Sequence, residues 1–341
     1  MKVLELFSGI GGMHYALKES GIPYSYIVAV DINTSANGVY KHNFPISCLL
    51  YRNIQSLTLE EMNNISPDIL LMSPPCQPFT RVGLKRDIED NRSCALMFLL
   101  EMLPKTNGSL KYILVENVKG FDTSNARLKL LEFLEENHFI YQEFLLSPTQ
   151  FGISNSRTRY YLIARKKPLE FGFPTSSSII TDLADIGIST SGDSCYPIST
   201  ILSVDDDFDS LEYKQLLIPL EKLVKHINVM DIVSKDDKRS CCFTKAYGNY
   251  IEGTGSVYSP FPLDETPKRE NYPSEELFLE ALRSLKLRFF SPTEIARLMC
   301  FPDNEFGFPK THSLKQKYRL LGNSINVKVV ACLIKLMVNG S

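Results

Sequence analysis

The sequence predicts an α/β fold in which a mostly parallel sheet is followed by a smaller second unit. Short apolar runs alternate with helix-like segments over the first 165 residues. This alternation is typical of βαβ crossovers, which join parallel strands. It ends after Lys166, where Ser/Thr-rich and Asp-rich stretches carry no sustained hydrophobic period. We therefore expect a domain boundary near that residue.

Six apolar runs are expected to form strands of the sheet. They occupy residues 3–7, 26–30, 68–72, 112–116, 141–146 and 160–164. Beyond the boundary, a helical pattern returns at residues 275–287, and Ser291 with Glu294 resembles a capping box that opens another helix. The apolar segment 327–337 is expected to pack back on the first unit.

The composition is that of an ordinary soluble globular protein, with 341 residues of which 44% are hydrophobic and 22% charged. No stretch resembles a signal peptide or a membrane span, so we expect neither export nor membrane insertion. The eight cysteines include no CxxC pair, which indicates free thiols and no structural metal. Because the net charge is −2, a nucleic-acid partner would need a local basic patch.

A glycine loop follows the first predicted strand. It reads Ser8-Gly9-Ile10-Gly11-Gly12, and Asp31 closes the next strand about twenty residues later. Glycines let the backbone approach a bound nucleoside, and a strand-end carboxylate can hold ribose hydroxyls. The loop lacks the full GxGxxG spacing, so a tight strand-to-helix turn without a ligand is an equal alternative.

Cys76 is the candidate nucleophile. It lies in Pro74-Pro75-Cys76-Gln77-Pro78, directly after the predicted strand 68–72. The prolines fix the backbone and hold the thiol at the carboxyl end of the strand, where ligands bind in open parallel sheets. A lone cysteine is more often a small buried hydrophobe. The position between prolines favours a nucleophile instead.

Glu116 and a pair of arginines complete the candidate site. Glu116 ends a predicted strand, where partial burial would raise the pKa of its carboxyl group and suit it to general acid catalysis. Most strand-end carboxylates are simply solvated or cap a helix. Arg157 and Arg159 lie two residues apart, so we expect them on the same face of a strand. They suit a phosphate, a carboxylate or a base carbonyl, although surface arginines without a role are the default.

Taken in order, these motifs resemble the motif series of the cytosine-5 methyltransferases, and Leu321-Gly322-Asn323-Ser324 completes the series. The motif Cys242-Phe243-Thr244 and the segment from Tyr318 to Val327 look like the type-2 DNA methyltransferase homologue branch. Members of that branch methylate a cytosine in the anticodon loop of aspartate tRNA. The resemblance spans the whole chain.

The resemblance implies a class I S-adenosylmethionine-dependent methyltransferase with a Rossmann-like sheet and a smaller target-recognition domain. The catalytic domain would comprise residues 1–165 completed by 317–341, and the target-recognition domain residues 166–316. Cys76 would attack carbon 6 of the cytosine while Glu116 donates a proton to nitrogen 3. Arg157 and Arg159 would position the base. Loss of the carbon-5 proton after methyl transfer then expels the thiolate, with S-adenosylhomocysteine as the other product.

The resemblance also implies which residues line the cofactor and which kind of nucleic acid is the substrate. The implied cofactor residues are Phe7, Ser8, Gly9, Ile10, Gly11, Gly12, Asp31, Ile32, Asn53, Ile54, Ser73, Asn323 and Ser324. Asn53-Ile54 and Asn155 depart from the pattern of the DNA-acting members, which weighs against DNA as the substrate. A late basic cluster predicts RNA contacts. Its members include Lys238, Arg239, Lys245 and Arg288.

We expect tRNA as the main partner, weak DNA binding, no membrane association, a monomer, and a location in the cytoplasm and also the nucleus. Three alternatives remain. They are a DNA cytosine-5 methyltransferase, a cofactor-binding interaction protein that has lost catalysis, and a nicotinamide-dependent oxidoreductase. The presence of both Cys76 and Glu116 weighs against a catalytically silent protein. The Pro-Pro-Cys-Gln loop has no part in hydride transfer.

Overall fold

The larger sheet has seven strands in the order β3-β2-β1-β4-β5-β7-β6 in this computed structural model, which describes residues 1–75, 94–189, 194–263 and 265–339. The strands are β1 (Lys2–Leu6), β2 (Tyr26–Asp31), β3 (Cys48–Tyr51), β4 (Ile69–Met72), β5 (Tyr112–Val118), β6 (Phe139–Leu146) and β7 (Arg159–Lys166). Strands β1 to β5 pair in parallel, and β7 lies antiparallel between β5 and β6. The predicted mostly parallel sheet is confirmed.

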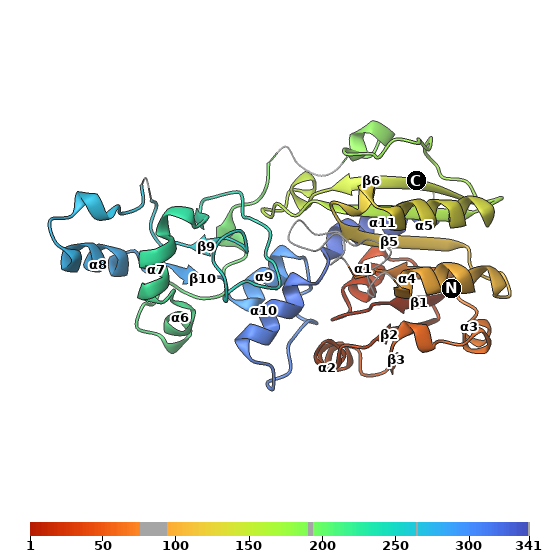
Figure 1. Cartoon of the computed structure of the whole chain (residues 1–341), viewed down its shortest axis with the longest axis horizontal. Coiled ribbons are helices and arrows are strands. Elements are labelled where there is room, and N and C mark those ends of the chain that lie inside the picture. Colours follow the sequence, from red (N-terminus) through yellow and green to blue (C-terminus); the bar gives the residue numbers. More distant parts are fainter. Residues whose placement is uncertain (76–93, 190–193, 264, 340–341) are drawn as a thin grey trace.

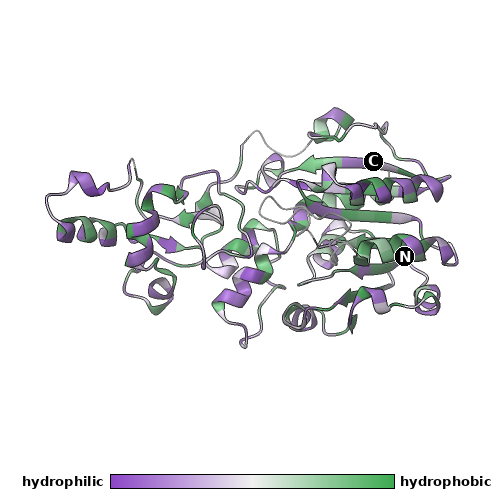
Figure 2. Ribbon diagram, in the orientation of Figure 1, coloured by the Kyte–Doolittle hydropathy of each residue, from purple (hydrophilic) through white to green (hydrophobic). Residues whose placement is uncertain are grey.

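Helices cover both faces of this sheet, which explains why its strands are continuous apolar runs. On β1, Val3 packs in the hydrophobic cluster that contains residues of α1 (Gly12–Ser20), α2 (Thr34–Asn43) and α11 (Val327–Asn339). The next residue, Leu4, packs in the opposite cluster with α3 (Leu59–Ile65), α4 (Cys94–Met102) and α5 (Asn125–Glu136). Figure 2 shows apolar strands between helices whose outer faces are hydrophilic.

The last helix packs back on the first unit, as predicted. Helix α11 contacts α1 and also β5 and β7. Together with α10 (Leu314–Gly322) it falls in the segment Leu314–Asn339, which by length and composition could cross a membrane. Within the protein 61% of its most apolar window is buried, which is the behaviour of a core segment.

A second, three-stranded sheet lies apart from the first (Figure 1). It has the order β10-β9-β8. Its elements are α6 (Leu211–Leu216), α7 (Leu220–His226), β8 (Ile232–Val233), β9 (Val257–Tyr258), α8 (Glu275–Ser284), β10 (Arg288–Phe289) and α9 (Pro292–Leu298). The helix expected at 275–287 is confirmed as α8. The capping box between Ser291 and Glu294 is also present at the start of α9.

Candidate active site at the carboxyl edge of the sheet

Glu116 lies on β5 near its carboxyl end and is only 7% exposed. Burial raises the pKa of its carboxyl group, while Arg159, Arg157 and a hydrogen bond from Ser73 act in the opposite direction. The net shift is upward. A carboxyl group in this setting holds its proton to higher pH than an exposed one does, which suits it to donate that proton to a substrate.

The ends of β4 and β5 are tied together beside Glu116. Ser73, the first residue after β4, donates a hydrogen bond to Glu116. The side-chain amide of Asn117 donates to the carbonyl oxygen of Pro74 at 3.3 Å. These two contacts fix the segment that leads to Cys76. Cys76 itself lies outside the described residues, so its role as nucleophile stays a prediction.

The paired arginines meet at the site but make different contacts. The Arg159 Nε atom lies 3.6 Å from Oε1 of Glu116. The buried guanidinium of Arg157 instead donates to the carbonyl oxygens of Phe243 at 3.0 Å, Gly322 at 3.2 Å, and Ser324. Arg159 therefore contacts the carboxyl group of Glu116 directly. Arg157 is a positioning residue that joins three separate chain segments.

The glycine loop after β1 leaves no room for a side chain at two positions. Gly11 has a φ of 86°, and a Cβ atom there would lie 2.5 Å from the ring of Phe44. A Cβ atom on Gly12 would lie 2.7 Å from Ile325. Both contacts are closer than side chains tolerate, so tight packing against Phe44, which follows α2, and against Ile325, which precedes α11, explains these two glycines without a ligand.

The first part of the loop has features that packing does not explain. The Gly9 amide donates to Oδ2 of Asp31 at 2.8 Å, which ties the loop to the end of β2. The hydroxyl of Ser8 is buried without a partner. Ile32, the residue after Asp31, has a large apolar side chain that is 67% exposed. A carboxylate, an unpaired hydroxyl and an apolar surface together fit a nucleoside.

Comparison with known proteins shows which family has this arrangement. The family model for C-5 cytosine-specific DNA methylase matches residues 1–339. The chain belongs to this family. The methylase is 45% identical over 342 residues to the tRNA (cytosine(38)-C(5))-methyltransferase of Spodoptera frugiperda, with 98% of each chain covered. It is 43% identical over 387 residues to the human protein of the same name, with 99% of each covered.

Solved structures of two relatives have the same fold. A crystal structure of a mutant of Spodoptera frugiperda DNMT2 matches with a TM-score of 0.85 and 44% identity, over 98% of both chains. The structure of Schizosaccharomyces pombe Dnmt2 methyltransferase matches with a TM-score of 0.82 and 36% identity, over 99% of this chain and 98% of that one. The predicted methyltransferase fold is thereby confirmed. Enzymes of this family depend on S-adenosylmethionine in general.

The remaining residues that were predicted to line the cofactor differ in their surroundings, and not all of them are free to contact a ligand. Ser324 is buried, and its hydroxyl would lie 3.1 Å from a Cβ on Gly12, so the C-terminal segment lies beside the glycine loop. Ile54 is only 4% exposed and belongs to the hydrophobic core, which leaves its side chain little surface for a ligand. Asn53 caps a short helical turn through Gln55. Asn323 is exposed after α10.

The prediction that Arg288 binds RNA is wrong. Its side chain is fully buried, and its guanidinium forms a bidentate ion pair with Glu294 at 2.8 and 2.9 Å. The guanidinium carbon also lies 4.4 Å from the ring centre of Tyr258. A group enclosed in this way cannot reach a phosphate. Lys238 and Lys245 are exposed, and so is Arg239, which pairs with Asp231; their contact with RNA stays a prediction.

Cys242 is a site residue that the sequence did not identify as one. Its sulfur accepts hydrogen bonds from Nη1 of Arg157 at 3.2 Å and from Nη2 of Arg159 at 3.7 Å. The only sequence signal was its place in the Cys-Phe-Thr motif, which marks the branch but does not indicate a function. The contact arises between residues more than 80 positions apart.

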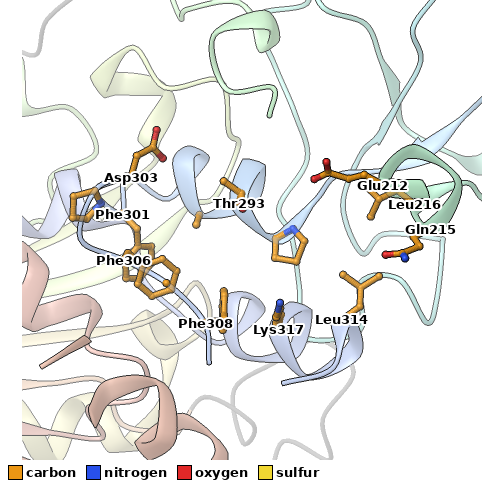
Figure 3. Close-up of a pocket in the computed structure, with 14 residues that line it drawn as sticks. Glu212, Gln215, Leu216, Thr293, Phe301, Asp303, Phe306, Phe308, Leu314 and Lys317 are labelled. Atoms are coloured by element: carbon orange, nitrogen blue, oxygen red, sulfur yellow. The ribbon is translucent and has the colours of Figure 1, made fainter. Parts of the chain in front are cut away.

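A cavity of about 420 Å³ lies away from these groups, between α6, α9 and α10 (Figure 3). Phe301, Phe306 and Phe308 line it together with Lys317. None of the residues assigned to methyl transfer borders this cavity, so it does not mark the reaction site. Among the described residues, no group of three His, Cys, Asp or Glu side chains could hold a metal ion.

Proposed function

We propose that this methylase transfers a methyl group from S-adenosylmethionine to carbon 5 of a cytosine in the anticodon loop of aspartate tRNA. The observation that carries the proposal is the buried carboxyl group of Glu116, held between Ser73 and Arg159 at the carboxyl edge of the sheet. The tRNA substrate is supported by the Spodoptera frugiperda and human tRNA (cytosine(38)-C(5))-methyltransferases, which are 45% and 43% identical to this chain.

The chemistry begins with activation of the cytosine ring. The protonated Glu116 donates to nitrogen 3, which makes carbon 6 electrophilic, and the thiolate of Cys76 forms a bond to that carbon. Carbon 5 then acts as the nucleophile. Bound S-adenosylmethionine supplies an electrophilic methyl group on its sulfonium. Solvent water takes the carbon-5 proton, and the electron pair left behind expels the Cys76 thiolate from carbon 6. Glu116 takes back the proton from nitrogen 3 as the aromatic ring is restored.

Arg159 acts on the same groups from the side of β7. Its guanidinium lies beside Glu116 and can stabilise the negative charge that the carboxylate acquires when it gives up its proton. Arg157 holds the neighbouring segments in place by donating hydrogen bonds to the carbonyl oxygens of Phe243 and Gly322. The burial of both side chains excludes water, which strengthens these electrostatic interactions.

The cofactor is proposed to lie against the glycine loop. Asp31 would accept hydrogen bonds from its ribose, and Phe7 and Ile32 would offer apolar surface to its adenine. Both Asp31 oxygens already accept a backbone N–H, from Gly9 and Asn33, and two carboxylate oxygens can together accept about four hydrogen bonds. S-adenosylhomocysteine would leave from the same position.

The substrate side is proposed to involve the smaller unit. We propose residues 1–165 with 317–341 as the catalytic domain and 166–316 as the target-recognition domain, with the exposed Lys238, Arg239 and Lys245 on the RNA side. We further propose a monomer that binds DNA weakly and works in the cytoplasm and nucleus.

Methylation of DNA is the second candidate, because a relative from Dictyostelium discoideum that is 39% identical over 369 residues bears the name DNA (cytosine-5)-methyltransferase. The test is to supply labelled S-adenosylmethionine with folded aspartate tRNA or with duplex DNA, followed by bisulfite sequencing of both. We expect methylated cytosine in the tRNA. Methylation of DNA alone would contradict the proposal, and Glu116→Gln serves as the inactive control.

A further inference from the structure

Cys242 reaches from the smaller unit to the paired arginines of the site. It lies in the segment between β8 and β9, and its sulfur contacts Arg157 at 3.2 Å and Arg159 at 3.7 Å. The side chain is partly buried. The sulfur of Cys242 therefore contacts both guanidinium groups of the proposed methyl-transfer site.

When Glu116 is protonated, the two guanidinium groups of this cluster need a counter-charge from another side chain. Arg157 and Arg159 bring two positive charges into a buried setting. Glu116 must be protonated to act as the acid, so it cannot neutralise them in the reactive state. Buried charge without a counter-charge is costly, and a thiolate at Cys242 would supply one.

The other titratable groups in the described part of the site do not supply this charge. Tyr161 on β7 faces the same cluster, but burial and the nearby Glu116 raise the pKa of its hydroxyl, so it stays neutral. Cys241 follows the same pattern, since burial and Asp231 raise the pKa of its thiol. Asp231 itself pairs with Arg239.

The thiol of Cys242 responds in the opposite direction. Burial acts to raise its pKa, but Arg157 and Arg159 outweigh burial, and the pKa falls below its ordinary value. Guanidinium groups beside a thiol stabilise the thiolate in this way at many reactive cysteines. The electrostatics therefore agree with the geometry.

We propose that Cys242 is a positioning residue for methyl transfer, because its thiolate holds Arg159 beside Glu116 and offsets part of the positive charge of the arginine pair, so that Glu116 keeps its proton. This inference rests on the proposed function. Without the thiolate, the two guanidinium groups would favour the Glu116 carboxylate, and the acid would be deprotonated at a lower pH. The smaller unit thereby controls the ionisation of the catalytic acid.

The ionisation can be tested without any turnover. The absorbance of thiolate at 240 nm is titrated in Cys76→Ala and in Cys76→Ala with Cys242→Ser. We expect the single variant to show one thiol that ionises below the ordinary thiol pKa of about 8.5, and the double variant to lack it. Cys241→Ser in the same background is the matched control and should retain the signal. Titrations that coincide with and without Cys242 would overturn the proposal.

The effect on Glu116 is tested by the pH profile of kcat on tRNA. The alkaline limb reports loss of the Glu116 proton, so Cys242→Ser should move that limb to lower pH by about one unit. Cys241→Ser should leave it in place. A purely structural role would lower kcat by the same factor at every pH, and that result would contradict the proposal. If the unaltered protein fails to methylate tRNA, the proposed function falls, while the thiolate titration still decides the state of Cys242.

Discussion

The Nε atom of Arg159 lies 3.6 Å from Oε1 of Glu116, and the two side chains come from neighbouring antiparallel strands, β7 and β5. The side chains are only 15% and 10% exposed. An acid and a cation are thus placed together where water is largely excluded. Their pairing allows one group to give up a proton while the other stabilises the charge that remains.

Replacing Glu116 with glutamine should remove the proton donor and keep the shape of the site. We expect kcat to fall by about 10²- to 10⁴-fold, because general acid catalysis contributes that much. Affinity for S-adenosylmethionine and the melting temperature should change little. Single-turnover methyl transfer measures the effect, and Glu132→Gln on the exposed face of α5 is the control. A loss of less than about tenfold would remove Glu116 from the mechanism.

Replacing Arg288 with methionine should destabilise the protein without affecting RNA binding. The substitution leaves the buried Glu294 without its partner, which costs about 3–5 kcal/mol in the free energy of unfolding. Lys328→Met breaks an exposed pair with Glu19 and should cost less than about 1 kcal/mol. Urea denaturation measures both. Equal small losses would show that the ion pair at Arg288 is not buried as described.

The basic residues that remain exposed should carry the salt dependence of tRNA binding. Reversing Lys238, Arg239 and Lys245 to glutamate removes three cations, so affinity should fall and the plot of log K against log salt should become shallower. Affinity for S-adenosylmethionine should not change. The control reverses three lysines exposed elsewhere, Lys105, Lys129 and Lys335. An unchanged slope in the first variant would place the RNA surface on another face.

The way in which the free energy of unfolding changes with pH should depend on Glu5. This fully buried residue on β1 accepts a hydrogen bond from the Tyr40 hydroxyl at 2.9 Å, and burial raises its pKa to about 8. The folded protein then holds a proton that the unfolded chain releases above about pH 4.3. Between these values the free energy of unfolding falls as pH rises, by about 1.4 kcal/mol per unit.

Glu5→Gln should remove that dependence. Between about pH 6.5 and 8 the free energy of unfolding should fall less steeply with pH in the variant than in the unaltered protein. The two slopes should differ by the contribution of about one bound proton. This window avoids His14, whose pKa is lowered to about 4 by burial and by Lys18. Urea titrations at several pH values provide the slopes. Parallel slopes would mean that Glu5 is ionised in the folded protein.

The main elements could be predicted because their signals are local. Each predicted strand is a short, mostly apolar run, and Ser291 and Glu294 form their capping box within one helical turn. Strand β3 was missed because it has four residues, all at least partly exposed at the edge of the sheet. Charge alone suggested that Arg288 faces RNA. Its burial depends on Glu294 and on Tyr258, which no periodicity reveals.

The site was predictable in part for the same reason. Glu116 lies near the end of β5 and Arg159 begins β7, so the order of elements brings them to one edge. Arg157 was expected on the same strand but lies two residues before it. The part played by Cys242 depends on a contact across the two units, and Arg157 proved to hold carbonyl groups that the sequence does not link to it. Contacts of this kind arise from tertiary packing, so they cannot be predicted from the spacing of residues along the chain.

The most direct test of the account is to locate the covalent bond between the enzyme and its substrate. Folded tRNA with 5-fluorocytosine at the target position is incubated with the enzyme and S-adenosylmethionine, because fluorine prevents the final elimination. The account predicts a stable adduct that peptide mapping places on Cys76, and no adduct in Cys76→Ala. An adduct on Cys242, or turnover retained by Cys76→Ala, would contradict it.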